Sequence, residues 1–380
     1  MDYERVIGLE VHCELKTNSK MFSASPVTFG EDPNTMINEV DMGMTGTLPC
    51  LNKRGVEFAI RVCHALHMEI DELLCFDRKN YYYSDLPKGF QITQDKRPIG
   101  RNGYLMIEVD GEEKRIDIER LHMEEDTAKQ LHLTDYSLID YNRAGIPLIE
   151  IVTKPCIRSG KEASAYLEAL RQVFLYTEVS DAKLEEGSMR CDVNVSIRPF
   201  GQEAFGTRTE IKNLNSISNV QKAIDYEAGR QQEVIESGGE VLQETRRYDE
   251  VEKVTTVMRS KGDAVDYKYY TEPNILPIRL DHAWVEQIKD ELPMMAGERE
   301  KHYEEEYGIP KVDAKILVST KSMSDYFNEV IKYTKNYKNA SNWLLGDVLA
   351  FLNKNNQSYD DIELNPEYLA KLINFIEDGT

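Results

Sequence analysis

Carboxylates and an imidazole share one surface of the first strand-like segment of the chain. From residue 7 to residue 15, apolar and polar residues alternate strictly. Since successive side chains of a β-strand point to opposite faces, Glu10, His12 and Glu14 lie on one face and apolar residues on the other. For this segment alone two interpretations stay open: the solvated side of an antiparallel strand, or part of a functional site.

A second strand pattern, from residue 188 to residue 197, also has a polar face that can meet a ligand. Its polar side chains are those of Arg190, Asp192, Asn194 and Ser196. A third pattern, from residue 147 to residue 152, is apolar except for Glu150. Because a buried carboxylate needs a partner, Glu150 predicts a neighbouring group that can be a cation.

An acidic triplet, Glu124-Glu125-Asp126, stands at the predicted end of another strand. Like charges side by side repel each other unless a metal ion or basic groups offset them. Oxygen ligands with one imidazole suit Mg²⁺, which proteins hold through a few side chains together with nucleotide phosphates. An acidic solvated turn is the alternative interpretation of this triplet.

A basic and aromatic segment, residues 77–89, has the composition of a phosphate-binding wall. Lys79 and Lys88 can reach phosphate oxygens, and tyrosines such as Tyr82 can line a pocket. A tyrosine-rich strand packed on its neighbours fits the same residues equally well. Lys212 is a weaker signal of the same kind.

Composition and missing motifs exclude several classes of protein. The net charge of −21 argues against a nonspecific nucleic-acid binder, because such proteins gain most of their affinity from Lys and Arg on phosphates. The Walker A loop, the HExxH zinc motif and the GxSxG nucleophile elbow do not occur. No apolar stretch approaches the roughly 20 residues of a membrane span. The six cysteines form no CxxC pair, so we expect a cytosolic protein with reduced thiols.

The elements that must position these residues predict an α+β fold with much antiparallel sheet. A hairpin is expected at Asp110-Gly111, since this dipeptide accepts the positive φ angles of a tight turn. One helix is expected after Ser159, whose capping-box partner is Glu162, and another over residues 218–236. No regular βαβ rhythm is present, and after about residue 290 the apolar periods become helical.

Taken in order, the motifs closely resemble those of the B subunits of aspartyl/glutamyl-tRNA amidotransferases. The resemblance covers essentially the whole chain. It rests on long motifs in the same order and spacing, namely segments 6–12, 77–81, 86–92, 121–126, 142–152, 185–194, 210–216 and 243–247.

The resemblance implies a fold in two parts. Residues 1–290 would form a cradle domain similar to glutamine synthetase, with a largely antiparallel sheet. Residues 291–380 would form a small all-α helical domain. The tRNA-binding tail domain of the relatives is expected to be absent from this chain.

Site residues follow from the same resemblance. The catalytic set is expected to consist of Glu10, His12, Glu125, Glu150 and Asp192. Of these, His12, Glu125 and Glu150 are expected to bind Mg²⁺, with Mn²⁺ as the alternative ion. The residues expected near ATP or the ammonia entrance are Lys79, Tyr82, Lys88, Ser188, Arg190, Asn194 and Lys212.

The implied activity is ATP-dependent amidation of Glu-tRNA, Asp-tRNA or both. The expected partners are an amidase subunit that releases ammonia from glutamine, a third small subunit and the aminoacyl-tRNA. No membrane partner is expected, and the expected location is the cytoplasm. Two alternatives stay open: a free-standing ATP-dependent amide ligase that acts on a small carboxylate, and a noncatalytic scaffold that presents tRNA to a partner enzyme.

Overall fold

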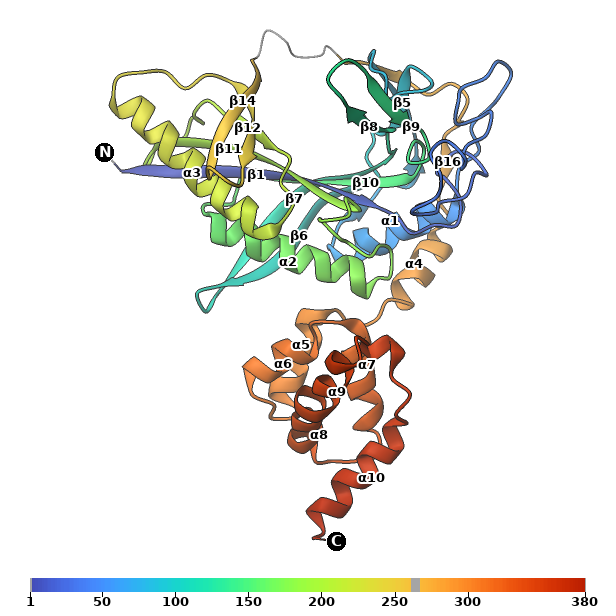
Figure 1. The fold of residues 1–380 in the computed structure, drawn as a ribbon, viewed down its shortest axis with the longest axis vertical. Helices are drawn as coiled ribbons and strands as arrows, with labels where there is room; N and C mark the ends of the chain where they lie inside the picture. Colours follow the sequence, from blue (N-terminus) through green and yellow to red (C-terminus); the bar gives the residue numbers. More distant parts are fainter. Residues whose placement is uncertain (1, 261–266, 380) are drawn as a thin grey trace. The chain divides into compact units, whose positions relative to one another are not determined.

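The computed structural model describes residues 2–260 and 267–379, and the chain divides into two compact units. The first unit ends at Leu292 and the second begins at Pro293, whereas the sequence pattern placed the boundary at about residue 290. The first unit is built on a large sheet, and the second is helical (Figure 1).

A largely antiparallel sheet forms the centre of the first unit. Among the described residues, its nine strands run in the order β14-β13-β12-β11-β1-β10-β7-β6-β2. Only the pair β12 and β13 is parallel within this described sheet. In the same order, the strands span Val254–Ser260, Glu244–Asp249, Thr209–Lys212, Met189–Pro199, Tyr3–Glu14, Pro147–Thr153, Glu112–Glu125, Gly100–Val109 and Glu69–Ile70. This architecture confirms the predicted α+β fold class.

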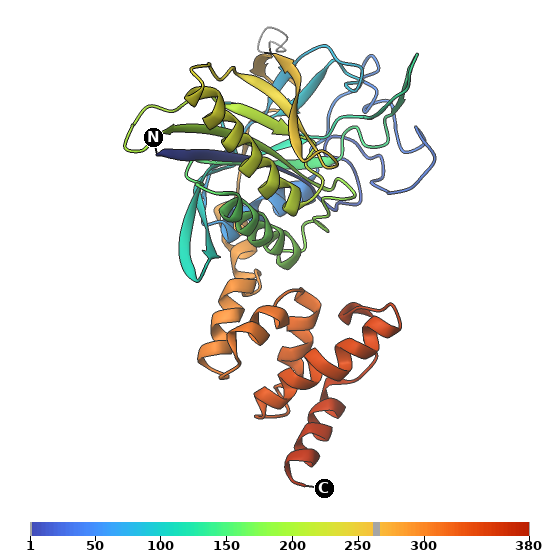
Figure 2. The same ribbon diagram turned by 60° about the vertical axis from the view of Figure 1, so that its left-hand side comes forward.

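Helices cover one face of this sheet and leave the other face to polar side chains. They are α1 (Lys53–Ala65), α2 (Gly160–Tyr176) and α3 (Ile217–Glu236). Helices α2 and α3 lie side by side along the sheet in both ribbon views (Figures 1 and 2) and pack on β6 and β11. A fourth helix, α4 (His282–Asp290), packs on α1.

The predicted N-cap of α2 and the predicted hairpin turn are present, but the capping box is only half formed, because the Glu162 carboxylate accepts from the backbone N–H of Arg158 at 2.7 Å and not from that of Ser159. Ser159 precedes α2, and its Oγ accepts a hydrogen bond from the backbone N–H of Glu162 at 3.1 Å. The hairpin between β6 and β7 turns at Asp110 and Gly111, whose φ angles are 53° and 84°. Local side-chain chemistry therefore sets where these elements begin and turn.

The side chains of strand β7 switch faces of the sheet at one irregularity in its pairing. Ile118 is fully buried before it and Leu121 is fully buried after it, so the buried positions change from even to odd numbers. Between them, the pairing with β10 shifts by one residue and leaves Glu119 without a partner there. Because strand alternation has a period of two, one extra residue turns the following side chains to the opposite faces. The residues that this turns to the polar face are Arg120, His122 and Glu124.

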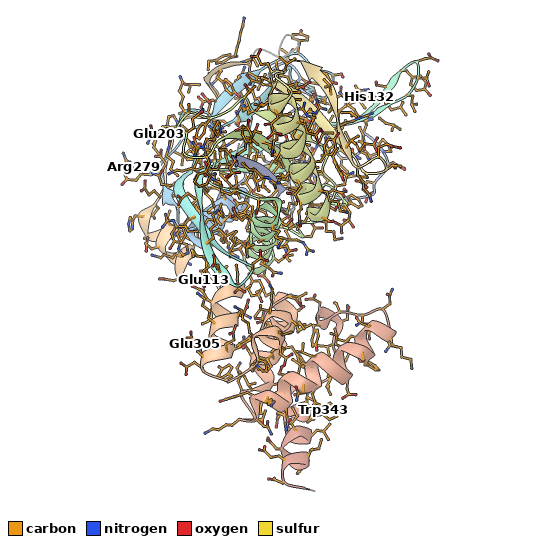
Figure 3. All side chains as sticks on the ribbon, turned by 90° about the vertical axis from the view of Figure 1, so that its left-hand side faces the viewer. Glu113, His132, Glu203, Arg279, Glu305 and Trp343 are labelled. Carbon is orange, nitrogen blue, oxygen red and sulfur yellow. The ribbon has the colours of Figure 1, made fainter. Side chains whose placement is uncertain are left out.

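Smaller sheets complete the first unit. A sheet of β15 (Lys268–Thr271), β4 (Asp77–Asn80) and β5 (Phe90–Thr93) forms a second wall beside the polar face of the large sheet. The strands β3 (Leu73–Leu74) and β16 (Ile278–Arg279) pair with each other. The pair β8 (Lys129–His132) and β9 (Ser137–Asp140) forms a hairpin with His132 near its tip (Figure 3).

The second unit is a bundle of short helices packed around aromatic side chains such as Tyr303 and Phe327, whose rings lie 4.9 Å apart. Its elements are α5 (Ala296–Glu305), α6 (Lys311–Leu317), α7 (Lys321–Val330), α8 (Tyr337–Trp343), η2 (Leu344–Val348), α9 (Leu349–Lys354), η3 (Tyr359–Asp361) and α10 (Pro366–Glu377). Among the described residues of both units, no helix is both long enough and apolar enough to cross a membrane.

Candidate active site

The register of three neighbouring strands brings polar residues together on one face of the sheet. His12 of β1 pairs with Glu150 of β10, and Glu150 pairs in turn with His122 of β7. Side chains of directly paired residues in antiparallel strands lie on the same face. These three side chains therefore form a row across the polar face.

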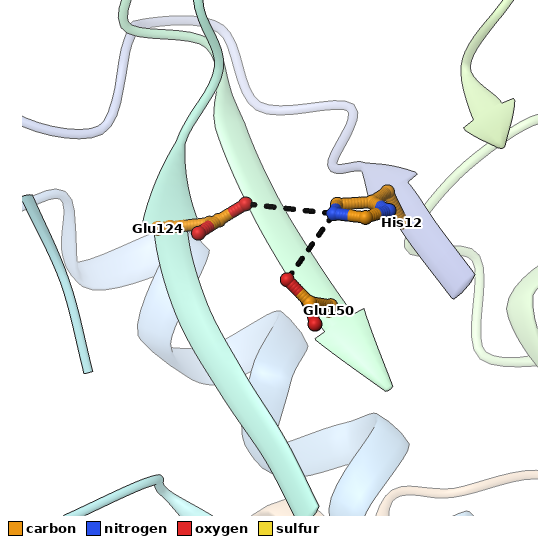
Figure 4. Close-up of side chains that lie close together, drawn as sticks. All are labelled: His12, Glu124 and Glu150. Atoms are coloured by element: carbon orange, nitrogen blue, oxygen red, sulfur yellow. Dashed lines mark ion pairs between the residues drawn. The ribbon is translucent and has the colours of Figure 1, made fainter. Parts of the chain in front are cut away.

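A compact cluster of possible metal ligands lies on this row. The Nε2 atom of His12 lies 3.1 Å from Oε2 of Glu150 and 3.9 Å from Oε1 of Glu124 (Figure 4). The three ligand atoms all lie within 4.8 Å of one another. Each residue comes from a different strand, so the sheet itself fixes the spacing.

His122 is a second imidazole in this cluster and was not among the predicted site residues. It is 5% exposed, and its Nε2 lies 3.3 Å from Oε2 of Glu150 and 3.6 Å from Oε2 of Glu124. Its buried Nδ1 has no hydrogen-bond partner. The signal was present in the sequence, because the order His122, Met123, Glu124 places an imidazole and a carboxylate on one face of a strand.

Strong mutual electrostatics hold the cluster together. Burial alone would raise the pKa of Glu150, but the two imidazoles outweigh it and hold this pKa well below its usual value. Burial alone would lower the pKa of His122, yet Glu150 and Glu124 raise it to about 9. Carboxylates and imidazoles thus neutralise each other in the folded chain, and a bound cation can take over that balance.

The donor set fits a divalent cation of the Mg²⁺ type. Two carboxylates and one imidazole offer hard ligands, and Mg²⁺ usually takes only a few protein ligands. His122, whose Nε2 lies 3.3 Å from Oε2 of Glu150, would help to orient this carboxylate. The residues present therefore match the predicted metal, with Glu124 in the position that the sequence analysis gave to Glu125.

A second acidic cluster lies beside the first. Carboxylate oxygens of Glu10, Asp192 and Glu210 lie within 4.8 Å of one another. Here Lys212 supplies the balancing charge: its ammonium donates to Asp192 and lies 3.1 Å from Oε1 of Glu210. Asn194 donates to Oε1 of Glu10 at 2.9 Å. Burial, with help from Glu150 and Asp192, raises the pKa of Glu10.

Both clusters open into one cavity of about 450 Å³. Within the described part of the chain, seven carboxylates and four Lys or Arg side chains line it, so the cavity has an excess of negative charge. The predicted residues that the fold brings to it are Glu10, His12, Glu150, Asp192, Asn194, Lys79 and Lys212. Lys79 stands on the opposite wall, with its Nζ 4.5 Å from the ring centre of Tyr267.

Glu125 does not lie in this cavity, in contrast to its predicted place beside His12 and Glu150. Both of its carboxylate oxygens accept hydrogen bonds from Nζ of Lys88 at 2.6 Å, and Oε1 accepts another from the backbone N–H of Ile92 at 2.9 Å. The physical reason is the irregularity in β7, because unbroken alternation from Ile118 would have turned Glu125 toward the cavity. Lys88 accordingly lies outside the cavity as well.

Three other predicted nucleotide contacts also lie away from the cavity. Tyr82 is 99% exposed. The guanidinium of Arg190 binds Asp126, and the hydroxyl of Ser188 donates to Oδ1 of Asp181 at 2.5 Å. Alternation placed Arg190 on the correct strand face, but its side chain turns along the sheet toward Asp126 at the strand ends.

A carboxylate pair near this strand end predicts a pH-dependent stability. Burial, together with the charge of Asp126, raises the pKa of Glu14 from 4.5 to about 8. Between these values Glu14 keeps its proton in the folded chain and loses it in the unfolded chain. The folded state then binds more protons, so the free energy of unfolding should fall as the pH rises from 4.5 to about 8.

Glu14→Gln should remove this dependence, because glutamine does not titrate. Urea denaturation at several pH values measures it, with Glu39→Gln at an exposed site as the control. A variant whose stability still fell as steeply as that of the wild type would show that another group is responsible.

Comparisons with known proteins identify the family of the chain. The model of the GatB/GatE catalytic domain matches residues 5–286, and that of the GatB domain matches residues 325–380. Subunits B of the aspartyl/glutamyl-tRNA(Asn/Gln) amidotransferase from Staphylococcus aureus strains MRSA252, JH9 and N315 are each 54% identical over 380 residues, which is 100% of this chain and 80% of each relative. These matches confirm the resemblance found in the motifs, and the chain therefore belongs to the GatB family, that of the B subunits of aspartyl/glutamyl-tRNA(Asn/Gln) amidotransferases.

Proposed function

We propose that this chain is the subunit that uses ATP to activate and amidate the amino acid carried by Glu-tRNA(Gln), Asp-tRNA(Asn) or both. The observation that carries the proposal is the cavity in which His12, Glu124 and Glu150 converge beside the second acidic cluster. The names of the S. aureus relatives supply the substrate class. A cavity with possible metal ligands and basic groups on its walls suits phosphoryl transfer, which depends mainly on positioning and charge stabilisation.

In this proposal His12, Glu124 and Glu150 would hold Mg²⁺. The ion would offset the charge of the nucleotide phosphates. Lys79 lines the cavity on the opposite wall, and its ammonium would meet phosphate oxygens there. Burial alone would lower the pKa of Lys79, but Glu124, two tyrosines and Glu150 together outweigh it and raise this pKa, so the side chain stays charged.

The second acidic cluster would position the reacting carboxylate. Lys212 already bridges Asp192 and Glu210, and its ammonium can also donate a hydrogen bond to a substrate oxygen. The side-chain amide of Asn194 donates a hydrogen bond to Glu10 and so holds this carboxylate at the edge of the space for the substrate. Repulsion from these carboxylates would keep the substrate carboxylate next to the cationic groups.

The reaction would proceed in two balanced steps. A carboxylate oxygen of the tRNA-linked side chain attacks the γ-phosphorus of ATP, and ADP leaves, which yields an acyl phosphate. Ammonia then attacks the acyl carbon, phosphate leaves, and the nitrogen loses a proton to give the amide. An amidase subunit would supply the ammonia from glutamine, and a third small subunit would complete the assembly, in the cytoplasm where charged tRNA is used.

Conversion of radiolabelled Glu-tRNA to Gln-tRNA by the assembled complex tests this function. Ammonium chloride in place of glutamine makes the assay independent of the amidase reaction. We expect product that depends on both ATP and Mg²⁺, with about one ADP formed for each amide. Amidation of free glutamate at a similar rate would favour the small-substrate ligase, and absence of ADP formation would favour the scaffold.

A further inference from the structure

Arg120 is a cation in the cavity that no described group neutralises. It lines the cavity from β7, two residues before His122. Among the described residues it forms no ion pair, and its Nε, although buried, has no hydrogen-bond partner. It was not among the predicted site residues, and it has no role in the proposed reaction.

The irregularity in β7 gives Arg120 its position. It is the first residue after the unpaired Glu119, so it is also the first whose side chain turns to the cavity side. On the adjacent strand β6 it pairs with Arg101, which is exposed and donates to the backbone O of Lys96 at 2.7 Å. Two arginines are thus paired in register, and only Arg120 lines the cavity.

The lack of an ion pair at Arg120 among the described residues needs an explanation, because the cavity is rich in carboxylates. Burying part of a guanidinium without partners is unfavourable, since each unmet donor loses its hydrogen bonds to water. Carboxylates nearby satisfy Lys212 but not Arg120. Lys79 on the facing wall likewise has no ion pair within the described residues, and lies against the ring of Tyr267. With Arg208, three cations that have no ion pair among the described residues line one cavity, which is the arrangement expected of a site that binds an anion with several charges.

We propose that Arg120 binds the phosphate groups of the nucleotide, beside the cation held by His12, Glu124 and Glu150. The inference rests on the proposed ATP-dependent function. A planar guanidinium donates two parallel hydrogen bonds to phosphate oxygens, which a lysine cannot do.

Phosphate fits this position better than the carboxylate of the amino acid substrate does. Arg120 lies roughly 7 Å along β7 from His122, because each strand residue advances about 3.3 Å. A polyphosphate chain can span from the His122 row to Arg120 while one end stays at the metal ligands. The carboxylate of the amino acid substrate has to stay beside the phosphorus atom that it attacks, and it would leave Arg120 without a partner.

Calorimetric titration of the assembled complex with Mg-ATP tests the proposal. Arg120→Gln should weaken Mg-ATP binding by about 10- to 100-fold, because a hydrogen-bonded charge is lost. Arg120→Lys should fall between this variant and the wild type, and Arg101→Gln should bind like the wild type. The melting temperature of Arg120→Gln should stay unchanged, since no protein partner is lost.

Steady-state kinetics add a readout that separates the possible ligands. Arg120→Gln should raise KM for ATP and leave KM for Glu-tRNA unchanged. Wild-type affinity for Mg-ATP in Arg120→Gln, or a rise only in KM for Glu-tRNA, overturns the proposal. Failure of the wild-type complex itself to bind Mg-ATP overturns the proposed function, and the assignment of Arg120 with it.

Discussion

Glu124→Gln should weaken binding of Mg²⁺ by more than about 100-fold and abolish formation of Gln-tRNA. Removing the partners that merely orient metal ligands already costs 10- to 100-fold in many sites, so loss of a ligand should cost at least as much. Glu124 is 4% exposed, lies 3.9 Å from the imidazole of His12, and also accepts a hydrogen bond from Oγ1 of Thr93 at 3.2 Å. Glutamine keeps the size of the side chain and removes its charge.

Glu125→Gln is the matched control for this variant. It makes the same chemical change one residue away, on the carboxylate that binds Lys88 and not His12. We expect Glu125→Gln to retain wild-type affinity for Mg²⁺, or for Mn²⁺ as a paramagnetic substitute. The opposite result, loss of metal binding in Glu125→Gln and not in Glu124→Gln, would contradict the facing pattern of β7 and restore the metal set that the motifs suggested.

Lys88→Met should lower the free energy of unfolding by about 3 kcal/mol, because it leaves the Glu125 carboxylate buried without its cation. The two side chains are only 11% and 6% exposed, and both carboxylate oxygens lie 2.6 Å from Nζ of Lys88. Chemical denaturation at neutral pH measures the loss. Combining Lys88→Met with Glu125→Met should recover most of it, since no uncompensated charge then remains.

An exposed pair supplies the control for this cycle. Nζ of Lys161 lies 3.0 Å from Oδ2 of Asp110, but the side chains are 59% and 72% exposed. Solvent screens such a pair, so Lys161→Met should change stability very little. Equal losses in Lys88→Met and Lys161→Met would mean that burial of Glu125 adds nothing to the value of its ion pair.

Several local parts of this protein could be predicted from its amino-acid sequence. Alternation over residues 7–15 identified the polar face that carries Glu10 and His12, since side-chain direction in a strand depends only on the parity of the residue number. The cap at Ser159 and the turn at Asp110-Gly111 were likewise readable, because both depend on residues within four positions of each other. Long motifs identified the family, as the comparisons confirm.

Which of these local parts meet depends on contacts between residues far apart in the sequence. The bond between Asn194 and Glu10 joins residues 184 positions apart, and no local pattern fixes such a pairing. The choice of Glu124 over Glu125 depends on one unpaired residue in β7, which is defined by its pairing with β10 and not by its own type. The position of Arg120 has the same origin. Alternation along a strand predicts which face a side chain takes only as far as the first irregularity. Beyond it, that face depends on the pairing with the neighbouring strand. The sequence therefore predicted the strands of this site, and the structure selected its residues.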